Sequence, residues 1–191
     1  MIVTKTDIEG VVIIEPTLHS DNRGYFFESF NERDFAEATG ITTHFVQDNE
    51  SRSAEGVVRG LHLQLPPYAQ SKLVRVIEGE ILDIAVDIRR GSPTFGHHVA
   101  IRLSGENHRQ LFIPRGFAHG FIALRGDAIV QYKCDNYYAP ECERTILWND
   151  PALNIDWGRD GQLVTLSPRD SMAKTLDECD SLFDYNCDYY A

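Results

Sequence analysis

The stretch Val57-Val58-Arg59-Gly60-Leu61-His62-Leu63-Gln64 is typical of a buried β-strand, yet it carries one arginine and one histidine. Arginine is seldom buried without a partner, so a strand with both side chains suggests the wall of a pocket. Histidine moves a proton near neutral pH, and arginine holds a phosphate or carboxylate with two parallel hydrogen bonds. The octapeptide indicates either proton transfer on an anionic substrate or a core histidine beside a surface arginine.

Short apolar runs of this kind continue on both sides, and many are bounded by Gly, Pro, Asn or Asp. This spacing predicts a mostly β protein, an antiparallel sandwich or barrel with a few short helices, rather than βαβ units. A helix is predicted over Glu32–Thr39, with Asn31 as its N-cap and Gly40 at its end. Tight hairpin turns are predicted at Gly79 and Gly126. The strands are expected at 11–14, 25–30, 43–49, 56–64, 72–78, 80–87, 97–103, 110–113, 120–124 and 128–133.

Length and composition narrow the class of protein. A chain of 191 residues suffices for one domain, 1–191. Its net charge of −11 argues against a nucleic-acid partner, which needs a basic face. The chain shows no signal peptide and no membrane-length apolar stretch, so we expect a cytoplasmic protein without a membrane partner. The tail over 171–191 is expected to dock on the body through apolar residues, namely Leu176, Leu182, Phe183 and Tyr185.

Polar residues on two early strands are candidates for ligand binding. In the segment from Asp21 to Glu28, strand alternation puts Phe26 and Glu28 on one face, where a ring and a carboxylate can grip a ligand. The alternative is an amphipathic edge strand with an exposed glutamate. Gln47-Asp48-Asn49 ends a predicted strand, where its amides either read a sugar or base or form a turn.

Residue spacing limits which cations share a site. Arg59 and His62 differ by three positions, so a regular strand would turn them to opposite faces, and a bulge is one way to bring them together. Lys72 and Arg75 also differ by three, so we assign only one of them to the site.

Three later residues have more than one reading. His119 lies between small residues after Pro114-Arg115-Gly116, where it orients His62, binds a ligand or simply packs. Tyr132 can serve as a general acid if cationic neighbours lower its pKa, although most strand tyrosines are packing residues. Asp170 can orient a histidine, as the carboxylate of a catalytic triad does, but alone it reads as a turn or a helix cap.

A metal site is not expected. A metal-binding cupin carries a His-x-His pair, whereas this chain has Gln64, a poor ligand for transition metals, after His62 and Leu63. His97 and His98 are adjacent and would face opposite sides of a strand. The four cysteines lack the paired short spacing of a zinc site.

Taken together, these segments resemble the dTDP-4-dehydrorhamnose 3,5-epimerase family, cupin-fold enzymes that act on nucleotide sugars. The resemblance spans about residues 11–170 and rests on the order of its motifs rather than on any one. The motifs are Asp21-x-Arg-Gly-x-Phe-x-Glu, Gln47-x-Asn-x-Ser, Arg59-Gly-Leu-His-x-Gln, Lys72-Leu-Val, Asp87-x-Arg, Ser92-Pro-Thr-Phe-Gly, Pro114-x-Gly-Phe-Ala-His-Gly-Phe and Tyr132-Lys133.

The resemblance implies a cupin-type jelly roll and specific roles in dTDP-L-rhamnose biosynthesis. His62 would be the base that removes the proton beside the substrate's C4 ketone, with Asp170 as its partner and Tyr132 as the acid on the opposite face. Arg59 and Lys72 would bind the diphosphate or stabilise the enolate. It further implies a homodimer and no cofactor. The remaining substrate-binding positions would be Arg23, Phe26, Glu28, Gln47, Asn49, His119, Tyr138, Glu143 and Arg169.

One position departs from the family pattern: Arg169 stands where lysine is expected, and a planar guanidinium does not replace a compact ammonium. This difference bears on substrate fit rather than on reaction type. The alternatives are an epimerase that inverts only C3 or only C5, and a non-catalytic cupin that binds a sugar nucleotide. A metal-dependent cupin oxygenase is a more remote alternative.

Overall fold

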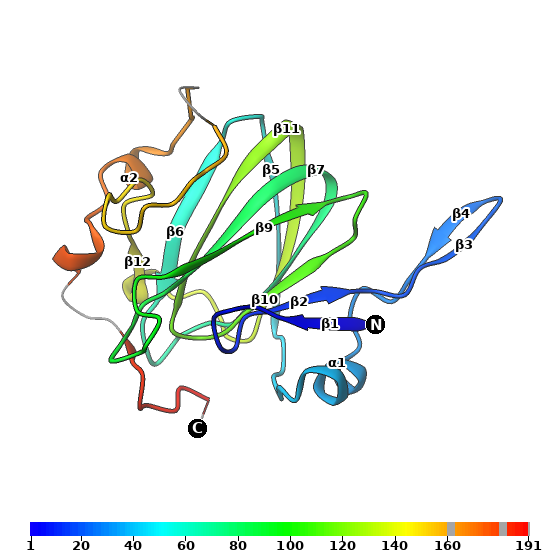
Figure 1. Ribbon diagram of the computed structural model, residues 1–191, viewed down its shortest axis with the longest axis horizontal. Helices are drawn as coiled ribbons and strands as arrows, with labels where there is room; N and C mark the ends of the chain where they lie inside the picture. The colour runs from blue at the N-terminus through cyan, green and yellow to red at the C-terminus, as the bar shows by residue number, and fades with distance from the viewer. Residues whose placement is uncertain (160–162, 180–182, 191) are drawn as a thin grey trace.

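The computed structural model describes residues 1–159, 163–179 and 183–190, and its main sheet is antiparallel throughout (Figure 1). Nine strands form this sheet in the order β1-β2-β10-β7-β11-β6-β12, with β5 on β11 and β9 on β7. The prediction of a mostly β protein is confirmed. The nine strands are β1 (Ile2–Lys5), β2 (Val12–Glu15), β5 (Gln47–Ser53), β6 (Val58–Gln64), β7 (Lys72–Asp87), β9 (His98–Ser104), β10 (Gln110–Ile113), β11 (Phe117–Cys134) and β12 (Glu143–Thr145).

Two small strand pairs lie outside this sheet. The strands β3 (His19–Asp21) and β4 (Gly24–Phe26) form a hairpin that projects away from the body (Figure 1). The strands β8 (Arg89–Arg90) and β13 (Phe183–Asp184) pair in parallel and tie the tail to the body.

The strands β7 and β11 are the backbone of the fold, because they pair with each other from Asp87 and Phe117 to Lys72 and Cys134. On its other edge, β7 pairs first with β10 and then, after Gly79, with β9. Likewise β11 pairs first with β6 and then, after Gly126, with β5. The predicted hairpin turns at Gly79 and Gly126 are therefore wrong. Both glycines have positive φ, 81° and 58°, but they bend continuous strands where the pairing register shifts.

The predicted helix is confirmed as α1 (Glu32–Thr39). The Asn31 side chain accepts a hydrogen bond from the Asp34 N–H at 3.2 Å, and Gly40 ends the helix with a φ of 74°. Phe35 anchors the helix in the core at 2 % exposure. The other helical segments are single turns: η1 (Pro140–Cys142), α2 (Pro168–Ser171) and η2 (Leu176–Glu178).

Two predicted strands are misplaced. The strand expected at 25–30 ends at Phe26, because the chain leaves it to enter α1. The strand expected at 43–49 lies at Gln47–Ser53 instead. Hydrophobic alternation could not locate β5, because its half-buried positions Gln47, Asn49 and Ser51 are polar.

The tail packs on the body through its apolar residues. Leu176 and Phe183 are 4 % and 2 % exposed, and both belong to the hydrophobic cluster that contains Leu61 and Ile122. Tyr185 is half-buried and donates a hydrogen bond to Glu9. Leu182, which was expected to dock as well, lies outside the described residues. Across the described residues, none of the helices has the length and apolar character needed to span a membrane.

Candidate active site

A bulge between β6 and β11 turns Arg59 and His62 toward one cavity. His62 lies opposite His119 and Arg59 lies opposite Phe121, so β6 takes three steps where β11 takes two. Gly60 makes this possible, because a Cβ there would lie 2.9 Å from the His119 carbonyl oxygen. The predicted bulge is confirmed, and it resolves the spacing that would separate the two side chains on a regular strand.

The cavity has a volume of about 410 Å³ and collects most of the predicted site residues. Of the two cations spaced by three positions, Lys72 lines it and Arg75 does not. Ser51, Gln64 and Gln70 also line it, although hydrophobic patterning gave no reason to select them. Among the described residues, those that line it are Gln47, Asn49, Ser51, Arg59, His62, Leu63, Gln64, Gln70, Lys72, His119, Phe121, Tyr132, Tyr138, Glu143 and Arg169.

His62 and Asp170 form a close pair at the edge of this cavity. The His62 Nε2 atom lies 2.7 Å from Asp170 Oδ1, and the two side chains are 23 % and 4 % exposed. Ser167 caps the short helix α2 that carries the carboxylate. Burial alone would raise the pKa of Asp170, but hydrogen bonds from His62, Ser167 and the Gly60 backbone outweigh it and hold that pKa below its ordinary value.

An ionised Asp170 sets the tautomer of its partner. The carboxylate only accepts, so the His62 proton sits on Nε2 and the Nδ1 lone pair is left as a base. Arg169 competes for the same nitrogen, because its Nη2 lies 3.1 Å from His62 Nε2 and a guanidinium can only donate. The Arg169 side chain is also paired with Glu143, which accepts a second hydrogen bond from the Tyr138 hydroxyl at 2.9 Å.

Lys72 and Tyr132 lie on β7 and β11, away from the His62 pair in sequence but in the same cavity. The Lys72 Nζ atom lies 5.8 Å from the centre of the Tyr132 ring. Burial lowers the pKa of the Lys72 ammonium, and nearby anionic groups offset only part of that effect. Burial likewise raises the pKa of Tyr132, so the condition named for a general acid, a pKa lowered by cationic neighbours, is not met within one chain. The phenol therefore keeps its proton at neutral pH.

A second histidine–aspartate pair, which sequence reasoning missed, lies beside the first. The His119 Nε2 atom lies 2.7 Å from Asp83 Oδ1, and both side chains are buried. Burial lowers the pKa of His119, and the Asp83 charge opposes this only in part. The Asp83 Oδ2 atom has no hydrogen-bond partner among the described residues. The sequence did contain a signal for this pair: Asp83 is the one carboxylate in the apolar run 81–86, and a buried charge needs a partner.

Three predicted substrate residues are not in this cavity. Arg23 is exposed on the β3–β4 hairpin, where it pairs with Asp21. Phe26 is 67 % exposed, and Glu28 accepts a hydrogen bond from Asn31. Phe26 and Glu28 line a separate cavity of about 580 Å³ beside α1. Within one chain, this hairpin and the His62 pair are separate.

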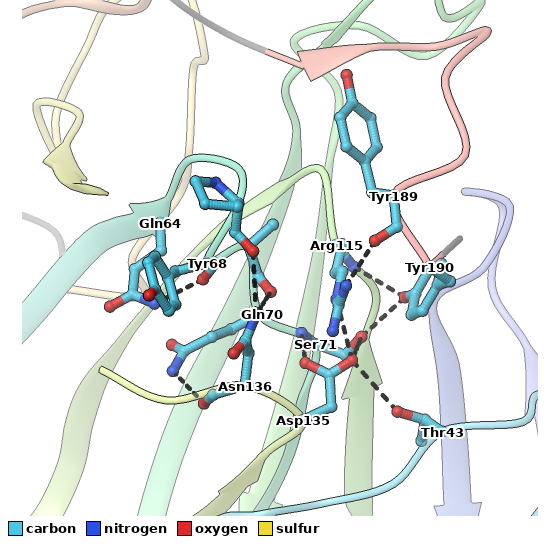
Figure 2. A network of polar contacts seen from close by, with 12 residues as sticks. Thr43, Gln64, Tyr68, Gln70, Ser71, Arg115, Asp135, Asn136, Tyr189 and Tyr190 are labelled. Carbon is cyan, nitrogen blue, oxygen red and sulfur yellow. Dashed lines mark hydrogen bonds and ion pairs between the residues drawn. The ribbon is translucent and has the colours of Figure 1, made fainter. Parts of the chain in front are cut away.

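Gln64 uses its amide to join two loops. Its Nε2 donates to the carbonyl oxygens of Tyr68 and Tyr137, and its Oε1 accepts from the Ala139 N–H (Figure 2 shows the Tyr68 bond). Within the described part of the chain, no group of three or more His, Cys, Asp or Glu side chains could hold a metal ion. Gln64 therefore has a structural task at the position where a metal-binding cupin carries a histidine.

Comparison with known proteins identifies the relatives of this chain. Residues 5–178 match the family model described as dTDP-4-dehydrorhamnose 3,5-epimerase. The enzyme of that name from Salmonella typhimurium is 53 % identical over 93 % of this chain and 97 % of its own length.

Two solved structures extend the comparison. An epimerase from Legionella pneumophila in complex with dTDP-4-keto-L-rhamnose has a TM-score of 0.93 and 51 % identity, covering 97 % of this chain and 98 % of the other. A variant of a 3′-monoepimerase from Streptomyces bikiniensis in complex with dTDP has a TM-score of 0.89 and 34 % identity, covering 95 % and 92 %. The expected cupin-type fold is thereby confirmed.

Proposed function

Since the chain belongs to the dTDP-4-dehydrorhamnose 3,5-epimerase family, we propose that the paired His62 and Asp170 carry the proton-abstraction step of its reaction. The enzyme is an isomerase of dTDP-L-rhamnose biosynthesis, and it inverts C3 and C5 of dTDP-4-dehydro-6-deoxy-D-glucose to give dTDP-4-dehydro-L-rhamnose. One observation carries the assignment of the base. His62 lines the cavity, a buried carboxylate holds its Nε2, and no hydrogen bond engages its Nδ1 within the described residues.

The chemistry begins at a C–H bond beside the C4 ketone. His62 takes the proton, and the electron pair moves onto the ketone oxygen as an enolate. Lys72 and Arg59 supply positive charge in the same cavity, which stabilises this oxygen or the diphosphate. Tyr132 then returns a proton to the other face of the carbon, which inverts the centre. No proton is gained or lost overall, since one leaves and one arrives at each carbon.

The other cavity residues would bind the substrate. Two amides on β5, those of Gln47 and Asn49, can hydrogen-bond the nucleotide or the sugar. Tyr138, Glu143 and Arg169 form a linked polar group at the cavity edge. His119 lies opposite His62 in register and is held by Asp83, so a neutral imidazole borders the reacting sugar.

The β3–β4 hairpin supports a homodimer in which each subunit completes its neighbour's nucleotide site. Arg23, Phe26 and Glu28 cannot join the His62 cavity of their own chain, and the hairpin extends away from the body (Figure 1). We therefore expect these residues to contact the nucleotide bound by a second copy. We also propose a cytoplasmic location, because the four cysteines are free.

Deuterium incorporation tests the reaction directly. The protein is incubated with dTDP-4-keto-6-deoxyglucose in D2O, and C3 and C5 are followed by NMR. Label at both carbons is expected, whereas label at one carbon identifies a mono-epimerase. Folded protein that binds the nucleotide but exchanges neither proton would refute the epimerase mechanism.

Mixing two inactive variants tests the shared site. If the hairpin acts on a neighbour, His62→Ala mixed with Arg23→Ala regains about a quarter of wild-type activity, since half the dimers are mixed and each has one intact site. No recovery after subunit exchange, in dimers verified by light scattering, would place Arg23 in its own chain's site, and full activity of Arg23→Ala alone would place it outside any site.

A further inference from the structure

The tail residue Tyr190 belongs to a polar network that also contains Gln64 and Gln70, two residues that line the cavity (Figure 2). Its centre is the Asp135 carboxylate, whose side chain is 2 % exposed. Donors from three separate segments converge on this carboxylate: the Ser71 hydroxyl at 2.9 Å, the Arg115 Nε at 3.1 Å and the Thr43 hydroxyl at 3.2 Å. The Ser71 backbone N–H adds a fourth hydrogen bond at 2.6 Å.

The Tyr190 hydroxyl completes this network as a relay of hydrogen bonds. It lies 2.7 Å from the Ser71 Oγ and accepts from the Arg115 backbone N–H at 3.0 Å. Since Ser71 donates its own proton to Asp135, its oxygen is free to accept the proton of Tyr190. The Arg115 guanidinium lies over the Tyr190 ring at 4.9 Å and donates to the Tyr189 carbonyl oxygen at 2.5 Å.

The network holds the ends of the two strands that carry site residues. Ser71 directly precedes Lys72 at the start of β7, and Asp135 directly follows Cys134 at the end of β11. Lys72 and Cys134 are register partners, so the relay fixes the last rung of the β7–β11 ladder. Tyr132 lies two residues before this rung.

The same network continues into the loop that bears Tyr138. Asn136 accepts from the Gln70 side chain at 2.8 Å through its carbonyl oxygen, and its own amide donates to the Pro67 carbonyl oxygen at 3.2 Å. Together with the Gln64 bonds, these contacts join 64–71 to 135–139 along their length. The network therefore holds the cavity wall that contains Gln64, Gln70 and Lys72. The opposite contact, at His62, is held by α2 and β12.

We propose that Tyr190 is a positioning residue of the epimerase site, which holds Lys72 in the cavity through Ser71. The tail is then a working part of the site rather than only a cover for the core. This inference rests on the proposed function, because Lys72 matters only if the cavity binds a dTDP-sugar. Loss of the hydroxyl would loosen and hydrate the Lys72 end of β7 without removing any group that touches the substrate.

The test compares Tyr190→Phe with Tyr185→Phe, which removes another tail hydroxyl that bonds only to Glu9 among the described contacts. Binding of dTDP is measured by calorimetry, and kcat and KM are measured across pH. We expect Tyr190→Phe to weaken dTDP binding by about 3- to 10-fold, the effect of one hydrogen bond. The alkaline limb of its kcat profile should move to higher pH, because hydration returns the pKa of Lys72 toward its ordinary value. Tyr185→Phe should match the wild type.

A double variant shows whether Tyr190 acts through Ser71. If it does, Ser71→Ala with Tyr190→Phe loses no more dTDP affinity than Ser71→Ala alone. Independent, multiplying losses would refute the relay, and so would unchanged dTDP binding in folded Tyr190→Phe. Calorimetry needs no turnover, so the two failures can be told apart. If the epimerase mechanism is wrong, the wild type binds dTDP but exchanges no proton. If the inference is wrong, the wild type exchanges protons and Tyr190→Phe binds dTDP as the wild type does.

Discussion

The molecule contains two histidine–aspartate pairs, whose histidines, His62 on β6 and His119 on β11, are register partners. In both pairs the same histidine nitrogen contacts a carboxylate oxygen. The Nε2 to carboxylate separation is 2.7 Å for both His62–Asp170 and His119–Asp83. They differ in access, because the His62 side chain is 23 % exposed and the His119 side chain only 6 %. Burial rather than composition thus distinguishes the two pairs, and the proposed mechanism assigns proton exchange with substrate to the more exposed His62.

The two carboxylates also enter by different routes. Asp83 comes from β7, the strand beside β11, and its environment is fully buried. Asp170 comes from the short helix α2, 108 residues after His62 in the chain, and three groups, His62, Ser167 and the Gly60 backbone, hold it by charge or hydrogen bonds. Strand pairing therefore positions Asp83 beside His119, whereas the contact of Asp170 with His62 depends on how α2 packs against β6.

Replacing His62 is expected to have the largest effect. His62→Asn removes the base, so proton exchange at C3 and C5 should fall by roughly 10²–10⁴-fold while the fold is retained. His119→Asn is the matched change in the buried pair, and it should cost less exchange because another group abstracts the proton. NMR in D2O measures both. Normal exchange in His62→Asn would show that the base is assigned incorrectly.

Replacing the carboxylates tests the comparison from the other side. Asp170→Asn no longer fixes the proton on Nε2, so kcat should fall by roughly 10²-fold or more, with little change in KM. Asp83→Asn should lower the free energy of unfolding by about 1–3 kcal/mol, because its charge-assisted bond to buried His119 is lost. Denaturant titration and steady-state kinetics separate the two effects. If Asp83→Asn lost kcat and Asp170→Asn lost only stability, the distinction between the two pairs would be wrong.

Removing the Tyr132 hydroxyl should separate exchange from inversion. Tyr132→Phe keeps His62, so deuterium should still enter, but inverted product should form roughly 10²-fold more slowly. Circular dichroism checks that the variant is folded. Equal losses of exchange and inversion would mean that Tyr132 supports binding instead of proton delivery.

The smallest expected effect is a pH shift from Lys72. Since burial lowers its pKa, the ammonium loses its proton at a lower pH than an ordinary lysine does, and kcat should decline there. The unfolded chain binds this proton more tightly, so the Lys72 contribution to stability rises with pH between the folded and unfolded pKa values. Lys72→Arg should move the alkaline limb of kcat upward, because arginine stays charged. An unchanged limb would exclude Lys72 as its source.

Local patterns predicted the parts of the fold that depend on neighbouring residues. Asn31 and Gly40 located α1 because caps satisfy backbone groups within one turn. Glycine patterns failed at Gly79 and Gly126, since positive φ looks the same in a hairpin and in a bent strand. Only the pairing of β7 with β11 along their lengths separates the two cases.

The site divides in the same way. His62 and Tyr132, the proposed base and acid, were selected from their residue types and motifs, because proton transfer needs groups of that chemistry. Asp83 and Tyr190 were not, since neither stands in a motif and the role of each depends on a partner that is distant in the sequence, His119 for Asp83 and Ser71 for Tyr190. The hairpin residues Arg23 and Glu28 stay a prediction for a neighbouring subunit.

By itself, the sequence determined a mostly β chain, the helix α1 (Glu32–Thr39) and the epimerase motifs, because these depend on local propensity and on the order of residues. The tertiary structure decided which groups meet. A bulge in β6 at Gly60 places Arg59 beside the same cavity as His62. The fold also brings Asp170, 108 positions later in the chain, to within 2.7 Å of the His62 side chain. Such contacts depend on strand register and burial, which no local pattern in the chain contains.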